Sequence, residues 1–465
     1  MTSLHALGAA ELSAGFAAGG LSPVEVATAA LDRIAAWEPS INAMYLVHRE
    51  SALAAARESQ ARWRAGAQRS ALDGVPITLK ENIHTRGDPS PVGCVVNDLT
   101  PQADDAPVAA RAREAGCVIL GKTTMPDYGM LSAGLSSIHG ITRNPWRLDR
   151  NTSGSSSGAA AAVVAGYGPL HVGTDIGGSV RLPATHGGFF GLKPSLGRIP
   201  IDPPYMGRVA GPMTRTVRDS AMLLVELSRP DARDFMSLPY REIDYPGALE
   251  GLAAKGLRVG FLPDMGVGLA VDPEVGRAAH AAASALERAG AVVERIPSFM
   301  TEAMLEGIQL FFEARSYNEV RDLPESALAR IHPFIVEWCT WRAGGFTGAD
   351  VMNGYTQVVL MREAAVRATA PFDFLISPTS PIPPYEVELP SPTDDPHDAL
   401  PHIAFTVAYN MSEQPAASLN WDYTPDGLPL GVQVIGKRFD DLGVLRMSRL
   451  LEQLRPAQRP WPEPG

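Results

Sequence analysis

The chain has 465 residues, of which 45% are apolar and 20% are charged, a balance typical of a globular protein with a sizeable core. Its formal net charge of −11 argues against a nucleic-acid partner, because phosphate binding requires a basic face. No run approaches the roughly 18 apolar residues of a membrane span, and no basic stretch precedes an apolar one in residues 1–20, so we expect neither a membrane partner nor a secretory signal.

The cysteines indicate the compartment. Cys94, Cys117 and Cys339 show no C-x-x-C spacing. An odd, unpatterned set of this kind favours buried thiols in a reducing compartment over disulfides or a zinc site. The sequence also lacks an H-E-x-x-H motif. We therefore expect a cytoplasmic protein that uses no metal and no cofactor.

Helical and strand-like patterns alternate along the chain. Ser22 and Pro23 predict the N-cap and first residue of an amphipathic helix that runs to Ala36, and a second helix follows. The further predicted elements, in chain order, are strand 75–79, helix 106–115, strand 117–120, helix 158–165, strand 170–173, helix 216–227, strand 258–262, helix 273–289, strand 292–296, a helical and aromatic-rich stretch 300–370, strand 374–377, a proline- and aspartate-rich loop 381–401, strand 431–435 and helix 442–454. This order predicts an α/β fold with helices layered on a mixed sheet.

Residues 116–123 match the P-loop pattern G-x-x-x-x-G-K-[ST] letter for letter. A phosphate-binding loop curls its middle residues into a backbone nest after a strand. Here the middle residues are Cys-Val-Ile-Leu, which themselves predict the strand, with Gly116 ending the preceding helix and Lys122 at the strand's exit. We therefore reject a nucleotide site at this position.

Residues 154–158 match G-x-S-x-G, the nucleophile elbow of α/β-hydrolases, with Ser156 as the nucleophile. An elbow needs a hydrophobic strand before it and a histidine downstream. The preceding residues 144–150 are instead polar and contain a proline, although the chain does offer downstream histidines: His332, His397 and His402. A Ser-His-Asp esterase therefore stays an alternative.

Two serine-bearing glycine turns and one lysine form the stronger pattern. A serine hydroxyl is a poor nucleophile until a base removes its proton, and a lysine held neutral can be that base. Lys80 follows the apolar run 75–79, where burial would lower the pKa of its amine. The glycines beside Ser179 let backbone N–H groups converge on an oxyanion. Singly, such lysines are usually surface charges and such serines turn residues, but their combination favours catalysis.

The residues around this pattern resemble the amidase signature family, whose members hydrolyse C–N bonds with a Ser–Ser–Lys triad. The likeness is dense from Leu72 to Pro194 and rests on Lys80-Glu-Asn, on residues 151–158 and on Gly-Thr-Asp-Ile-Gly-Gly-Ser-Val-Arg at 173–181. The family's glycine-serine string differs here at Ser153, Ser157 and Ala159, and Glu81 replaces its aspartate.

The resemblance implies a role for each site residue. Ser179 is the acylated nucleophile, Lys80 the base and Ser155 the proton relay. The implied oxyanion donors are the backbone N–H groups of Ile176, Gly177, Gly178 and Ser179. The implied substrate-binding residues are Met130, Leu131, Ser132 and Gly154, and the implied supporting residues are Ser156, Asp175 and Arg181.

The resemblance also implies the domain organisation. It predicts one α/β/α layered domain over residues 1–465, with a core at 72–228 and 370–455 and a helical cap at 230–370. Residues 188–194 resemble the loop behind the nucleophile, and residues 416–418 and 426–436 resemble the C-terminal strands. The expected partner is a small-molecule substrate, and a homodimer is compatible.

The substrate is less well defined by the sequence. Leu182 stands three residues after Ser179, where an arginine would clamp a substrate carboxylate. Six aromatic residues either line a cap over the cleft or form plain helix core: Phe311, Phe312, Tyr317, Phe334, Trp338 and Trp341. We expect an uncharged amide with an apolar or aryl leaving amine, and carbamates as a second class. The glutaminase component of a tRNA-dependent amidotransferase is the alternative within the family.

Overall fold

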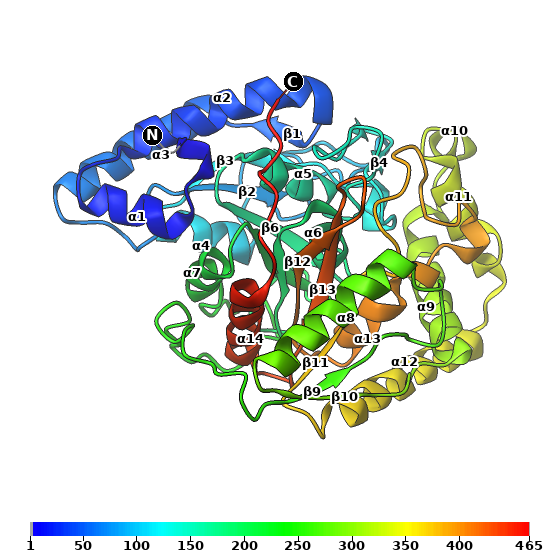
Figure 1. Cartoon of the computed structure of the whole chain (residues 1–465). Helices are drawn as coiled ribbons and strands as arrows, with labels where there is room; N and C mark the ends of the chain where they lie inside the picture. The colour runs from blue at the N-terminus through cyan, green and yellow to red at the C-terminus, as the bar shows by residue number, and fades with distance from the viewer. Residues whose placement is uncertain (1–2, 465) are drawn as a thin grey trace.

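The computed structural model describes residues 3–464 and is built on one mixed sheet of eleven strands (Figure 1). Across the sheet the order is β1-β3-β2-β6-β8-β7-β12-β13-β11-β9-β10. The strands are β1 (Met44–Val47), β2 (Pro76–Lys80), β3 (Val118–Thr123), β6 (Leu170–Asp175), β7 (Phe190–Lys193), β8 (Val209–Thr214), β9 (Arg258–Phe261), β10 (Val292–Arg295), β11 (Phe374–Pro378), β12 (Ala416–Tyr423) and β13 (Pro429–Ile435); β4 (Leu135–Ser136) and β5 (Gly140–Ile141) form a separate hairpin. The predicted α/β fold on a large mixed sheet is confirmed.

Two groups of parallel strands are joined by antiparallel ones. Strand β2 runs parallel to β3 and β6, and β9 runs parallel to β10 and β11. Every residue of β2, β3 and β6 is buried. Parallel strands covered by helices on both faces read as near-continuous apolar runs, which is why the sequence pattern located them.

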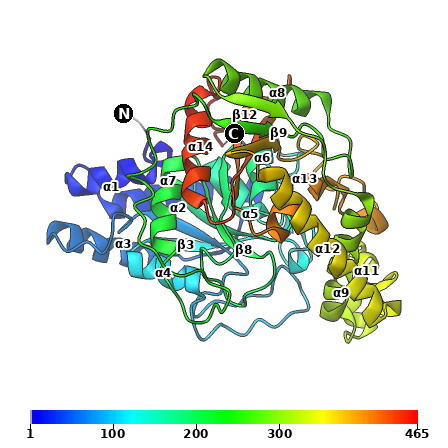
Figure 2. The same ribbon diagram turned by 90° about the horizontal axis from the view of Figure 1, so that it is seen from below.

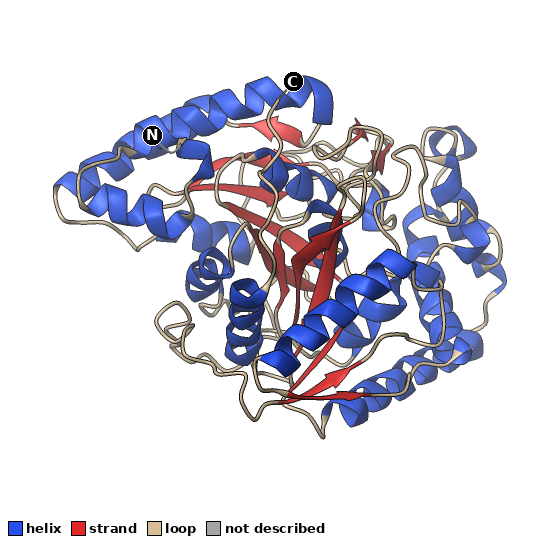
Figure 3. Ribbon diagram, viewed as in Figure 1, coloured by secondary structure: helices blue, strands red, loops and turns tan. Residues whose placement is uncertain are grey.

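Helices cover both faces of the sheet (Figure 3). Helices α4, α7, α8 and α14 pack on one face, α5, α6 and α13 on the other, and α2 and α3 against the β1–β3 edge. Their bounds, with those of the remaining helices, are α1 (Ala9–Ala17), α2 (Pro23–Ile41), α3 (Arg49–Arg64), α4 (Pro107–Ala115), α5 (Ser157–Ala165), α6 (Arg181–Gly187), α7 (Val217–Leu227), α8 (Pro273–Arg288), α9 (Glu302–Val320), α10 (Glu325–Leu328), α11 (Pro333–Thr340), α12 (Gly348–Thr369), α13 (Ala404–Met411) and α14 (Asp441–Leu454).

The segment expected as a helical cap, 230–370, contains two different parts. Residues 258–295 supply β9, α8 and β10, and both strands belong to the main sheet. Between residues 302 and 369 every regular element is a helix. Helices α9 to α12 lie in this part of the chain and gather at one side of the molecule (Figure 2). The cap expectation is therefore corrected for residues 258–295.

Two further segments bear on the sequence expectations. Residues 190–193, expected within a loop, form strand β7 between β8 and β12. The P-loop match is a strand, as predicted: Gly116 ends α4 with a φ of +85°, and β3 follows. Lys122 is buried and donates to the Ile83 carbonyl and to Thr85 Oγ1 at 2.9 Å, so its amine is held by the protein itself.

Within residues 3–464, no helix is both long and apolar enough to cross a membrane.

Candidate active site

The triad residues expected from the sequence come from two neighbouring strands and a loop. Lys80 is the last residue of β2, and Ser179 lies in the turn that follows its parallel neighbour β6. Ser155 lies just before α5. Because the carboxyl ends of parallel strands share one edge of the sheet, this topology brings a lysine at one strand end beside the turn after the next strand.

Lys80 is fully buried and is held by hydroxyl groups. Its Nζ donates to Ser155 Oγ at 2.8 Å and to Ser156 Oγ at 3.1 Å. Burial, with a smaller contribution from the Arg208 guanidinium, lowers the pKa of the Lys80 amine to about 7, and Asp175 only partly opposes this. A lysine in this state is available as a base near neutral pH.

The two serines beside Lys80 differ in access. Ser155 is 4% exposed and lines a pocket that Ser179 also lines. Ser156 is fully buried, donates to the Thr174 carbonyl at 3.2 Å and accepts from the Thr174 N–H at 3.3 Å. Ser156 therefore anchors the loop to β6 and has no path to a substrate.

This burial removes the nucleophile-elbow alternative. No histidine contacts Ser156 anywhere in the described chain. The downstream histidines are occupied elsewhere or isolated: His332 caps α11, His397 pairs with Glu337 at the surface, and His402 is buried without a partner among residues 3–464.

Asp175 and Arg181 hold the turn that carries Ser179. Both side chains are fully buried, and Arg181 Nη2 lies 3.0 Å from Asp175 Oδ1. Burial acts to raise the pKa of Asp175, but the Arg181 guanidinium and the Asn410 amide outweigh it and set this pKa to about 2. The arginine also donates to Gln433 Oε1 at 2.8 Å and to the Thr406 carbonyl at 2.9 Å. The turn is therefore tied to α13 and β13.

The Asp175 carboxylate also uses one of the expected oxyanion donors. The Gly178 N–H donates to Asp175 Oδ1 at 2.8 Å, so the expectation that this group is a free donor is wrong in this conformation. The N–H groups of Ile176, Gly177 and Ser179 have no acceptor within residues 3–464. These three are the donors that remain for an oxyanion.

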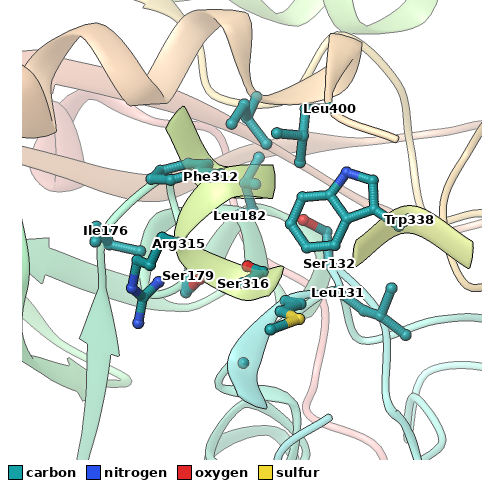
Figure 4. Close-up of a pocket in the computed structure, with 14 residues that line it drawn as sticks. Leu131, Ser132, Ile176, Ser179, Leu182, Phe312, Arg315, Ser316, Trp338 and Leu400 are labelled. Carbon is teal, nitrogen blue, oxygen red and sulfur yellow. The ribbon is translucent and has the colours of Figure 1, made fainter. Parts of the chain in front are cut away.

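An apolar pocket of about 480 Å³ opens beside Ser179 (Figure 4). Met130, Leu131 and Ser132 line it, together with the backbone of the Ser179 turn. Most of its other walls are apolar and come from α6, α9, α11 and the segment before α13: Leu182, Phe312, Trp338, Leu400 and Ile403. Two polar side chains of α9, Arg315 and Ser316, also line it. The sequence singled out Leu182 only because it stands where an arginine could bind a substrate carboxylate. In the structure it forms part of the pocket wall.

The aromatic residues divide between pocket and core. Phe312 and Trp338 line the pocket, whereas Phe334 is buried in the surrounding core. Phe311 packs on Tyr355, and Trp341 stacks on His397 at the surface. Some of these aromatic residues therefore line the cleft, and others form helix core or lie at the surface.

Gly154 does not line the pocket. A Cβ at this position would lie 2.7 Å from the Ala133 carbonyl oxygen, so the glycine is needed for close backbone packing. Its expected role in substrate binding is corrected to a structural one. Its neighbour Ser153, a departure from the family string, has a φ of +60°, in the region that favours glycine.

Glu81, the other departure, braces the loop that faces the site. Its carboxylate accepts the N–H groups of Val92 at 2.5 Å and Gly93 at 2.6 Å, and it pairs with His139 at 2.8 Å. The longer acid reaches both backbone groups from the end of β2.

A second, polar pocket of about 850 Å³ lies on the other side of Ser179. Besides Ser155 and Ser179 it is lined by two arginines, Arg208 and Arg315, which the sequence did not single out. Neither arginine belongs to a motif. They meet because Arg315 of α9 lies over the ring of Tyr205, in the loop before β8. No group of His, Cys, Asp and Glu among the described residues is arranged to hold a metal ion.

Comparison with known proteins gives related results from sequence and from structure. A family model described as Amidase matches residues 25–445. The chain is 35% identical over 469 residues to an acylamidase of Rhodococcus erythropolis, covering 97% of this chain and 96% of that protein. It is 34% identical over 480 residues to a component of the glutamyl-tRNA(Gln) amidotransferase of Myxococcus xanthus (strain DK1622), covering 95% of this chain and 96% of that protein.

Two solved structures share the whole architecture. A bacterial aryl acylamidase of the amidase signature enzymes has a TM-score of 0.89 and 28% identity, covering 98% of this chain and 97% of that one. A 6-aminohexanoate cyclic dimer hydrolase, solved with its substrate, has a TM-score of 0.88 and 29% identity, covering 99% of both chains.

Proposed function

The chain belongs to the amidase signature family and is a hydrolase of amides, and from this premise we propose that Ser179 forms the acyl-enzyme, with Lys80 as the base and Ser155 as the relay. The observation that carries this proposal is the buried contact of 2.8 Å between Lys80 Nζ and Ser155 Oγ, with the pKa of the amine lowered to about 7. A neutral amine at that position takes a proton from Ser155 as Ser155 takes one from Ser179.

Acylation then proceeds by attack of Ser179 Oγ on the amide carbonyl carbon. The carbonyl electrons move to oxygen, where the free N–H groups of Ile176, Gly177 and Ser179 face the developing charge. Preorganised donors of this kind typically lower the activation barrier by about 3–4 kcal/mol each.

Collapse of this intermediate breaks the C–N bond. The leaving nitrogen takes the proton that Ser155 delivers, and Ser155 regains one from the Lys80 ammonium. A water molecule then repeats the attack on the ester of Ser179, giving a carboxylic acid and the free hydroxyl.

The apolar pocket defines the acyl side of the proposed substrate. Leu131, Leu182 and Trp338 offer apolar packing surface to an acyl group on Ser179. Arg315 is the charged residue in the lining of this pocket, and its guanidinium lies on the side of Ser179 away from Trp338 (Figure 4). We therefore infer that acyl groups are uncharged and apolar or aryl. Carbamates form a second class, because the same acyl transfer expels an alcohol or an amine from them.

We place the enzyme in the cytoplasm, where its three free cysteines, all buried, stay reduced.

One observation favours a second candidate, the glutaminase reaction: the similarity to the amidotransferase component covers nearly the whole of both chains. Glutamine would place its charged amino-acid group on the acyl side, in a pocket lined mainly by apolar side chains. The apolar pocket therefore supports an acylamidase over a glutaminase.

Mass spectrometry of the acyl-enzyme tests the proposal. A fluorophosphonate or a slow aryl carbamate should label Ser179 with one adduct, and Ser179→Ala should lose both labelling and anilide hydrolysis. Ser156→Ala is the control for the site of labelling only, since its hydroxyl reaches neither pocket but does accept from Lys80 Nζ; the adduct should stay on Ser179 in this variant. Label on Ser156, or anilide hydrolysis that survives in Ser179→Ala, would refute the assignment. Hydrolysis of glutamine in preference to anilides would favour the second candidate.

A further inference from the structure

Two arginines that form no ion pair within residues 3–464 stand in the polar pocket beside the proposed nucleophile. Arg208 lies immediately before β8 and lines only this pocket. Arg315 lies on α9, stands between the polar and the apolar pocket and lines both. Ser155 and Ser179 line the polar pocket with them. Figure 4 shows the Arg315 guanidinium on the side of Ser179 away from Trp338. The two charges thus come from separate elements and meet at one site.

Neither guanidinium is neutralised by a carboxylate of residues 3–464. Arg208 Nη1 donates to the Pro203 carbonyl at 3.2 Å, and the Arg315 guanidinium lies over the Tyr205 ring at 5.0 Å from its centroid. Burial and the charge of Arg315 lower the pKa of Arg208 to about 10. Partly buried arginines usually have an acidic partner, so this pair has unused capacity for an anion.

The other charged groups of this pocket leave its positive character in place. Asp175 is neutralised by Arg181. Glu319 lies at the exposed rim, one turn beyond Arg315 on α9, and forms no ion pair with it. Burial, with the charges of Lys122 and Arg208, lowers the pKa of His84, so this histidine adds no positive charge at neutral pH.

The proposed reaction determines which end of the substrate faces these arginines. Ser155 delivers the proton to the leaving nitrogen, and it lines the polar pocket but not the apolar one. The amine side of the amide therefore lies in the polar pocket, and the acyl side lies in the apolar pocket.

We propose that Arg208 and Arg315 bind a carboxylate on the amine side of the substrate, so that the preferred substrates are amides of an apolar acyl group with an amino acid or an aminobenzoate. This inference rests on the proposed function and adds an anionic group to the amine expected from the sequence. Guanidinium groups bind carboxylates in paired, charge-assisted hydrogen bonds, which gives both affinity and orientation.

The test compares two anilides with the same hexanoyl group. One is the amide of 4-aminobenzoate, and the other is its neutral dimethylcarboxamide analogue. The neutral analogue has the better leaving amine, so a preference for the carboxylate runs against intrinsic reactivity. We expect kcat/KM, measured as release of the amine, to be about tenfold higher or more for the carboxylate.

Three variants assign this preference to the pocket. Arg315→Gln and Arg208→Gln should each reduce the ratio of the two kcat/KM values toward one. Arg321→Gln is the matched control, because Arg321 follows α9 at the surface and pairs with Asp322; it should keep the ratio. Equal kcat/KM for both anilides, or a ratio that neither pocket variant changes, would overturn the proposal.

Two further measurements separate this inference from the proposed function. The anilide of hexanedioic acid carries its carboxylate on the acyl side and should be a poorer substrate than hexanoyl anilide. The reverse order would show that the arginines bind a carboxylate on the acyl side, and it would overturn the proposal. Calorimetry with the Ser179→Ala protein reads binding without turnover, and it should show tighter binding of the aminobenzoate amide than of its neutral analogue. If wild-type protein hydrolyses neither anilide, the proposed function fails, while this binding result still decides the role of the arginines.

Discussion

The amine of Lys80 sets the pH dependence expected of the reaction. Burial lowers its pKa to about 7, and the base must be neutral to act, so kcat/KM should rise as pH increases through about 7 and level off above it. A pH profile on a neutral anilide measures this limb. A limb near pH 10 would show that the amine of the free enzyme is solvated and charged.

Arg208 also acts on this limb through its charge. Its guanidinium is the largest cause after burial of the lowered pKa of Lys80. Arg208→Gln should therefore move the alkaline limb of kcat/KM to higher pH, whereas Arg208→Lys, which keeps the charge, should move it less. The neutral anilide is the substrate for this measurement, because its binding does not depend on the arginine's charge. An unmoved limb in Arg208→Gln would contradict this contribution.

At the scale of elements, the turn after β6 depends on one buried ion pair. Arg181→Met would leave the Asp175 carboxylate buried without its main counter-charge, which typically costs about 3–5 kcal/mol of unfolding free energy. Urea unfolding measures the loss, and the same variant should lose amidase activity at temperatures where it is still folded, since Asp175 orders the backbone around Ser179. Arg277→Gln, which breaks ion pairs with Glu274 and Asp422 at the surface, is the control and should stay near wild type.

The elements that the sequence predicted well share one physical feature. Strands β2, β3 and β6 are short apolar runs buried on both faces, and α7 and α8 begin at a side-chain N-cap, Thr216 or Asp272. Such signals are local. Strands β1 and β8 were missed: β1 is only partly buried, and β8 contains a glycine and a proline.

The site was predictable to the same extent. Lys80 and Ser155 stand in local motifs, and the structure brings them into contact across the fold. The Gly178 N–H was expected to be free because nothing local shows that the Asp175 carboxylate turns back to accept it. Arg208 and Arg315 carry no motif at all, and their meeting depends on how α9 packs against the rest of the molecule.

At the scale of the whole molecule, three buried lysines make stability depend on pH. Burial lowers the pKa of Lys80 and Lys193 to about 7 and that of Lys122 to about 8, from an ordinary value of 10.5. Between these values the unfolded chain binds protons that the folded protein does not, so the free energy of unfolding rises with pH. Each lysine contributes up to about 1.4 kcal/mol per pH unit in this window.

This slope is measurable between pH 7 and 8, below the pKa of about 8.5 at which the thiols of the unfolded chain ionise and act against it. The urea midpoint should increase across this range, and Lys193→Met should reduce the increase, because Lys193 is fully buried and its Nζ donates only to the Pro194 carbonyl among residues 3–464. Lys193 lies outside both pockets, so Lys193→Met changes the pH dependence of stability without removing a residue of the proposed catalytic site. A midpoint that falls from pH 7 to 8, or one whose slope Lys193→Met leaves unchanged, would mean that these amines remain charged in the folded protein.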